Sequence, residues 1–200
     1  MNSDFHIGIS YQEDLPSELI EEYISSISEP ELKIRADSRE IGFYASIEWA
    51  LPTIVIVYLS KPYFEAFLQE AGKDHYQLLK KGTLKLFNRL YGSKPEKRDK
   101  KRSQLFSAMV QLKDDRSLKF VFPEGVGIEQ YEKSLELMHE LLLKHYVDYP
   151  NDQITEMASQ LSAPSRSLYI EYKAEKEGWV LIDPLVEAQK ARKAQNEHNK

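Results

Sequence analysis

Residues 47–81, IEWALPTIVIVYLSKPYFEAFLQEAGKDHYQLLKK, contain the segment on which the predicted fold depends. Within them, TIVIVYLS (53–60) is a continuous run of mostly β-branched apolar residues, which is typical of a strand buried on both faces. Pro52 stands just before this run, where its missing N–H does least harm to strand pairing. A segment of helix-like composition follows. The stretch therefore predicts a buried central strand that leads into a helix.

The same stretch is too short for a membrane span. Only 12 uncharged residues lie between Glu48 and Lys61, and Pro52 interrupts them, whereas a spanning helix needs about 20 apolar residues. A longer window that begins at Ile41 would place Glu48 inside the hydrocarbon layer, at a high energetic cost. We therefore do not expect a membrane partner.

Strand and helix patterns alternate through the N-terminal half of the chain. FHIGISY (5–11) and ELKIRAD (31–37) alternate apolar and polar residues, as strands do. Between them, LPSELIEEYISSIS (15–28) has apolar residues at helical spacing. After the central strand, residues 61–92 predict one or two helices broken near glycines. Because strands alternate with helices, residues 1–92 predict a small parallel sheet with flanking helices.

The second half begins after a change in composition. SKPEKRDKKRS (93–103) has six Lys or Arg residues, two acidic residues and no apolar side chain, so we expect a solvated basic linker or loop. Beyond it, residues 105–125 and 167–183 each predict a β-hairpin. Residues 127–146 and 150–164 each predict an amphipathic helix.

These patterns together predict an α/β fold whose C-terminal half, residues 104–183, is of the α+β type. That half is either a second small lobe or a continuation of the domain formed by residues 1–92. Residues 184–200 predict a polar tail. A chain of 200 residues is long enough for either arrangement.

Composition restricts the classes of function. The net charge is −5, so the whole chain is not expected to bind nucleic acid, although residues 94–102 would suit phosphate contacts. The absence of cysteine excludes a disulfide framework and a Cys-based zinc site. The opening MNSDFHIGIS lacks a signal-peptide pattern. We therefore expect a cytoplasmic protein.

The usual catalytic and metal-binding motifs are not found in the sequence. His139 and His145 are six positions apart and so do not reproduce the H-E-x-x-H spacing that places two imidazoles on one helix face. Neither G-x-S-x-G nor a phosphate-binding glycine motif occurs. We therefore predict no metal site.

Three segments of the first half remain, and they occur in a recognisable order. ISYQED ends the first predicted strand, RADSREIG follows the second, and IVIVYLSKPYFEAFLQEAG forms the third strand and the start of its helix. In this order they resemble a TIR domain, the Toll/interleukin-1 receptor type of α/β module. The resemblance covers about the first 75 residues of the chain.

TIR domains either signal by self-association or hydrolyse NAD at the nicotinamide glycosidic bond. The resemblance matches Ser60, Tyr63 and Glu70 to the family's serine, tyrosine and acidic residue. It implies that Glu70 is the candidate catalytic carboxylate, with Glu65 as the competing candidate. Such a carboxylate would assist an oxocarbenium-like centre at the nicotinamide ribose.

The resemblance also implies a ligand-binding end of the sheet. In an open parallel sheet, ligands bind beyond the carboxyl ends of the strands. Ser10, Asp37 and Ser60 would line that end together with Tyr63. NAD would be a substrate or ligand there, and no bound cofactor is expected.

Two functions remain open on this basis. The first is an interaction or regulatory protein of a bacterial defence or conflict system, which binds a protein partner or self-associates without catalysis. Its content of 12 Tyr, 8 Phe and 2 Trp suits a core and an interface alike. The second is a TIR-like enzyme or sensor that cleaves or binds NAD.

Overall fold

The computed structural model describes residues 5–40, 53–67, 72–97, 105–123, 125–160, 166–183 and 186. The strands are β1 (Ile7–Gln12), β2 (Ile34–Arg39), β3 (Thr53–Leu59), β4 (Leu105–Gln111), β5 (Ser117–Val121), β6 (Ser167–Lys173) and β7 (Gly178–Leu181). The α-helices are α1 (Ser17–Ile27), α2 (Lys61–Phe67), α3 (Gly72–Tyr91), α4 (Ile128–Asp148) and α5 (Gln153–Ser159). Two 3-10 turns are η2 (Pro95–Lys97) and η3 (Ala174–Lys176).

Strands from both halves of the chain form one seven-stranded sheet in the order β2-β1-β3-β4-β5-β6-β7. The second half therefore continues the sheet of the first, through the parallel pair of β3 with β4. The mixed α/β class is confirmed. The two predicted hairpins are also confirmed, because β4 pairs antiparallel with β5 and β6 pairs antiparallel with β7.

The strand directions correct one part of the prediction. β1 is parallel to β2, as expected, but β3 runs antiparallel to β1. The end of β2 and the start of β3 lie at the same end of the sheet, since Gln12 is in register with Arg39 and Tyr11 with Val55. β2 and β3 therefore run in opposite directions, whereas an all-parallel sheet would require them to run the same way. The segment REIGFYASIEWAL (39–51), whose sequence predicts a short helix or a turn followed by a helix, lies outside the described residues apart from Arg39 and Glu40.

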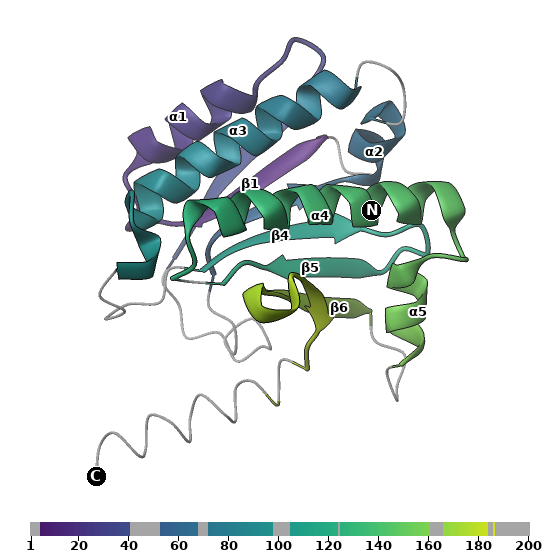
Figure 1. The fold of residues 1–200 in the computed structure, drawn as a ribbon. Helices are drawn as coiled ribbons and strands as arrows, with labels where there is room; N and C mark the ends of the chain where they lie inside the picture. Colours follow the sequence, from purple (N-terminus) through teal and green to yellow (C-terminus); the bar gives the residue numbers. More distant parts are fainter. Residues whose placement is uncertain are drawn as a thin grey trace.

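Helices α1, α3 and α4 cover one face of the sheet (Figure 1). Side chains of a strand alternate between its two faces, and the residues turned toward these helices form the core. At its centre, the Phe87 ring of α3 packs against Phe106 and Phe122 from the sheet and Tyr131 from α4. This aromatic contact joins the two halves of the chain. We call the opposite face of the sheet the second face.

A close contact between α1 and α3 depends on Gly82. A Cβ atom added at Gly82 would lie 2.5 Å from Ile27 Cγ2 and 2.6 Å from Ser26 Oγ. Ile27 is fully buried and β-branched, so its side chain has little room to move.

Among the described helices, none is both long and apolar enough to cross a membrane.

Gly82→Ala tests this contact. Alanine favours a helix interior over glycine by about 1 kcal/mol, but overpacking typically costs about 1–3 kcal/mol. We expect a net loss in the free energy of unfolding, measured by urea denaturation. Lys81→Ala, at an exposed neighbour on the same helix, should leave stability almost unchanged. A Gly82→Ala protein that is more stable than wild type would show that the two helices do not approach this closely.

Candidate functional site

Two of the sequence-predicted site residues are neighbours. Ser10 on β1 is in register with Asp37 on β2. Both side chains belong to the second face, because Ile9 next to Ser10 points into the core. Asp37 is exposed and forms an ion pair with Arg35 at 2.7 Å.

The other two described site residues lie elsewhere. Because β3 is antiparallel to β1, Ser60 follows β3 at the opposite end of the sheet. Its hydroxyl donates a bifurcated hydrogen bond to the backbone carbonyls of Phe5 and His6. Tyr63 is buried in the core, with its hydroxyl 3.2 Å from Nδ1 of His75. The structure therefore does not bring Ser60 and Tyr63 together with Ser10 and Asp37.

The two candidate carboxylates cannot be placed in this geometry. Glu65 belongs to α2, but its side chain lies outside the described part of the structure. Glu70 lies outside the described residues altogether. Their predicted role in NAD cleavage stays a prediction.

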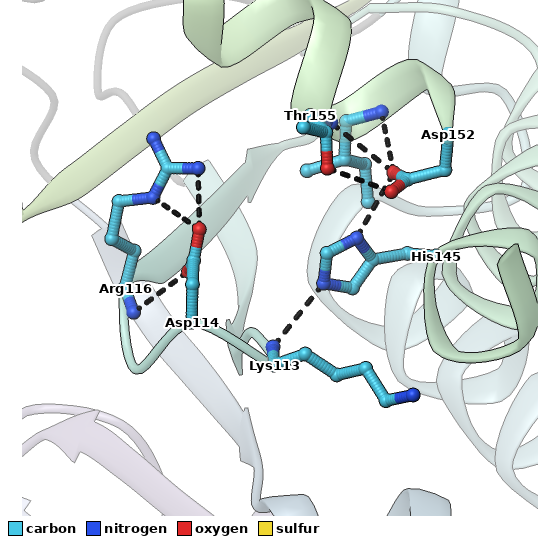
Figure 2. A network of polar contacts seen from close by, with 7 residues as sticks. Lys113, Asp114, Arg116, His145, Asp152 and Thr155 are labelled. Atoms are coloured by element: carbon cyan, nitrogen blue, oxygen red, sulfur yellow. Dashed lines mark hydrogen bonds and ion pairs between the residues drawn. The ribbon is translucent and has the colours of Figure 1, made fainter. Parts of the chain in front are cut away.

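The polar network with the strongest outward likeness to a catalytic centre surrounds His145. Figure 2 shows its ring between the backbone of Lys113 and the carboxylate of Asp152. Nε2 of His145 accepts a hydrogen bond from the Lys113 N–H at 3.2 Å, so the ring proton belongs on Nδ1, which lies 2.9 Å from Asp152 Oδ1. An Asp–His pair of this kind orients the general base in serine hydrolases.

The geometry of His145 nevertheless indicates a structural role. The nitrogen that would accept a proton from a nucleophile already accepts one hydrogen bond, and the side chain is only 1% exposed. Asp152 also caps α5 by accepting from the N–H groups of Ile154 and Thr155. The network therefore ties α4 and α5 to the hairpin turn between β4 and β5.

The lowered pKa values of two carboxyl groups agree with this structural role. Burial by itself would raise the pKa of the Asp152 carboxyl, but hydrogen bonds from Thr155 and His145 outweigh it and the pKa is lowered. In the same turn, Arg116 donates to Asp114 at 2.7 Å and holds the pKa of that carboxyl below its usual range against the effect of burial. Both carboxylates are therefore charged partners within the fold at neutral pH.

His75 and His139 also serve the fold. His75 contacts the Ile27 carbonyl through Nε2 at 3.1 Å, and His139 stacks on Tyr76 with ring centroids 3.6 Å apart. Burial lowers the pKa of His139 to about 4. Among the described residues, no group of three or more His, Asp or Glu side chains is arranged to hold a metal ion.

Sequence reasoning missed a buried basic cluster on the second face. Lys119 lies in the middle of β5 and is only 1% exposed, and its Nζ donates to Thr53 Oγ1 at 3.0 Å. The Arg39 guanidinium donates to the Thr53 carbonyl. Ser107 is fully buried nearby on β4. The lysine inside the otherwise apolar run LKFVF (118–122) was the available signal.

A groove with a mixed lining lies between α4, α5 and β7, with a volume of about 270 Å³. Leu137, Leu141 and Trp179 form its apolar floor. Its polar lining comes from the longer charged or amide side chains Glu140, Lys144, Gln153 and Glu177. Sequence reasoning assigned these residues to helix and hairpin surfaces but did not bring them together.

The floor of this groove is held rigidly. Nε1–H of Trp179 donates to the Ser134 carbonyl at 3.2 Å. The indole also makes edge-on contacts with Phe120 and Phe122, at centroid distances of 4.9 and 5.1 Å. The indole is therefore held in one position where it lines the groove, with 7% of Trp179 exposed.

Comparison with known proteins adds no relative. No protein-family model, no curated protein and no solved structure matches this chain.

Asp152→Ala tests the structural role of the His145 network. It removes a helix cap, worth about 0.5–2 kcal/mol, and leaves the buried His145 N–H without its acceptor, which costs about 1–3 kcal/mol. We expect a loss of about 1.5–5 kcal/mol in the free energy of unfolding at pH 7. Asp148→Ala, at an exposed residue of α4, should have little effect.

The loss should also depend on pH. Because the pKa of Asp152 is lowered in the folded protein, its carboxylate stabilises the fold above the unfolded-state pKa near 3.8. The difference between wild type and Asp152→Ala should shrink as the pH falls below that value. An equal effect of Asp148→Ala and Asp152→Ala would contradict the proposed role of the network.

The lowered pKa of His139 predicts a second pH dependence of stability. Its pKa is lowered to about 4 in the folded protein, so the unfolded chain binds a proton first as the pH falls from 6.5. Stability should therefore decrease between pH 6.5 and 4. Thermal melting of His139→Phe should show a smaller decrease across this interval than wild type. If the melting temperatures of the two proteins changed with pH in the same way, the pKa of His139 would not be lowered in the folded protein.

Proposed function

We propose that this chain is an interaction protein that binds a segment of a partner protein in the groove between α4, α5 and β7. The observation that carries the proposal is the rigid Trp179 floor surrounded by charged side chains. Protein interfaces have this anatomy, with an apolar centre and a polar rim. Tryptophan is among the residues that most often dominate binding energy.

The lining indicates the chemistry of the partner segment. Leu137, Leu141 and Trp179 would contact one apolar anchor side chain. On the rim, Glu177 already forms an ion pair with Lys133 at 2.8 Å, so the carboxylate of Glu140 and the ammonium group of Lys144 are the charges that face a partner. A segment with an apolar residue next to Lys or Arg would match both features, because a basic side chain at the rim would pair with Glu140.

Peptide selection on the full chain tests this function. From a displayed random library, we expect enrichment of peptides in which an apolar residue stands beside Lys or Arg. A synthetic peptide of the enriched sequence should bind in a titration that follows fluorescence anisotropy, and should alter the emission of Trp179. Glu140→Lys should lower the affinity for that peptide by about tenfold, because the attraction between Glu140 and the basic side chain of the peptide becomes a repulsion.

Glu21→Lys provides the matched control. It makes the same charge change on an exposed residue of α1 and should leave peptide affinity unchanged. Enriched peptides without the apolar–basic pattern, or equal binding to Glu140→Lys and wild type, would refute the proposal. The assignment to a bacterial defence system stays a prediction.

A further inference from the structure

We propose that the chain forms a symmetric dimer with a second copy of itself by antiparallel pairing of the edge strands β2. This surface is separate from the groove and does not depend on the proposed function. β2 is the first strand of the sheet order and pairs only with β1 among the described strands. Its residues 35–38 are exposed, including those on the helix-covered face.

The register of β1 with β2 shows which backbone groups of β2 point outward. The N–H of Ile7 donates to the Lys33 carbonyl and the N–H of Glu13 to the Arg39 carbonyl. In a parallel pair, alternate residues direct both their N–H and their C=O toward the partner strand. The backbone N–H and C=O groups of the odd-numbered residues of β2 therefore point toward β1. Those of Ile34, Ala36 and Ser38 point away from β1, toward the open side of the strand.

These outward groups match an antiparallel copy of the same strand. A twofold axis through Ala36 sets Ala36 opposite Ala36 of the second copy, and Ile34 opposite Ser38. All of these are outward-facing residues, so each pair would exchange both of its backbone hydrogen bonds. The two sheets would join without breaking any bond between β1 and β2.

The side chains between these pairs are complementary in charge. With Ala36 on the axis, Arg35 of each copy lies opposite Asp37 of the other. Such non-hydrogen-bonded pairs bring their side chains closest together, with Cα atoms about 4.5 Å apart. Arg35 and Asp37 share the second face and already form an ion pair within the chain. Each would gain an opposite charge across the new interface.

Each of the two neighbouring registers places like charges directly opposite one another on the twofold axis. A shift of two residues in one direction sets Arg35 opposite Arg35, and the shift in the other direction sets Asp37 opposite Asp37. Like charges directly opposite on paired strands are destabilising. Natural sheets often protect an edge with charged side chains, but in the Ala36-centred pairing the two charges nearest the axis, Arg35 and Asp37, are complementary.

The dimer should be reversible. One strand pair offers a smaller contact than the roughly 1,200–2,000 Å² of total area buried in stable complexes. Association should therefore increase with protein concentration. Sedimentation velocity of the wild-type chain over a wide concentration range should show a monomer that is converted to a dimer.

Ala36→Pro tests the backbone contact. Proline removes an outward N–H that β1 does not use, and prolines occur on edge strands for this reason. We expect a folded monomer at all concentrations, with folding checked by circular dichroism. If this variant lost its fold, the charge variants would still decide the question, because they change only exposed side chains.

Arg35→Asp and Asp37→Arg test the register. Each variant alone places like charges opposite one another, so its dimer should be weakened at least about tenfold. A mixture of the two variants should form a heterodimer, because the acidic pair of one chain then faces the basic pair of the other. The doubly substituted chain carrying both changes should regain self-association.

Two results would overturn the proposal. The first is a wild-type chain that stays monomeric throughout the concentration range. The second is a dimer that persists unchanged in Ala36→Pro or in both single charge variants, since its interface would then lie elsewhere. A mixture that fails to associate better than either single variant would likewise reject the Ala36-centred register.

Discussion

The rest of the structure depends on the position of β3. This strand is buried at every residue except Tyr58, which is partly exposed, and it pairs with β1 on one side and β4 on the other. It is therefore the connection through which the first and second halves become a single sheet. Its continuous apolar sequence reflects burial on both faces. The aromatic contact around Phe87 reinforces the same connection on the helix-covered face.

Most of the polar chemistry in the interior serves this architecture. His145 ties two helices to a hairpin turn, and His75 joins α3 to the end of α1. Buried polar groups of this kind are costly unless they are paired, and paired groups fix one arrangement of the elements. The surfaces that we propose for recognition lie at the margins instead, in the groove beside β7 and along the open edge of β2.

Much of the fold was predictable from the sequence, because local patterns specify local elements. The run at 53–60 predicted β3, and helical periodicity predicted α1 and α4. Both hairpins followed from β-prone runs separated by turn residues. The predicted parallel direction of β3 was wrong. The direction of a strand depends on how the chain connects it to the strand before, and the alternation of apolar residues carries no information about that connection. That single reversal separates Ser60 from Ser10 and Asp37.

The candidate site was less predictable for a related reason. The groove combines residues from α4, α5 and β7, which are brought together only by tertiary packing. Lys119 gave a local signal, as a charged residue within an apolar strand, but its partner Thr53 is far away in the sequence. The charge pattern of β2 was visible in IRADSR, yet its meaning requires the knowledge that this strand forms an edge.

The most direct test of this account is residue-resolved amide hydrogen exchange in β2, measured by NMR at low and high protein concentration. In the dilute protein, the amides of Arg35 and Asp37 should be protected by β1, while those of Ala36 and Ser38 should exchange rapidly. At high concentration, Ala36 and Ser38 should become protected as well. Protection of Ala36 and Ser38 in the dilute protein would contradict an open edge. Rapid exchange of these two amides at every concentration would contradict pairing of that edge with a second copy.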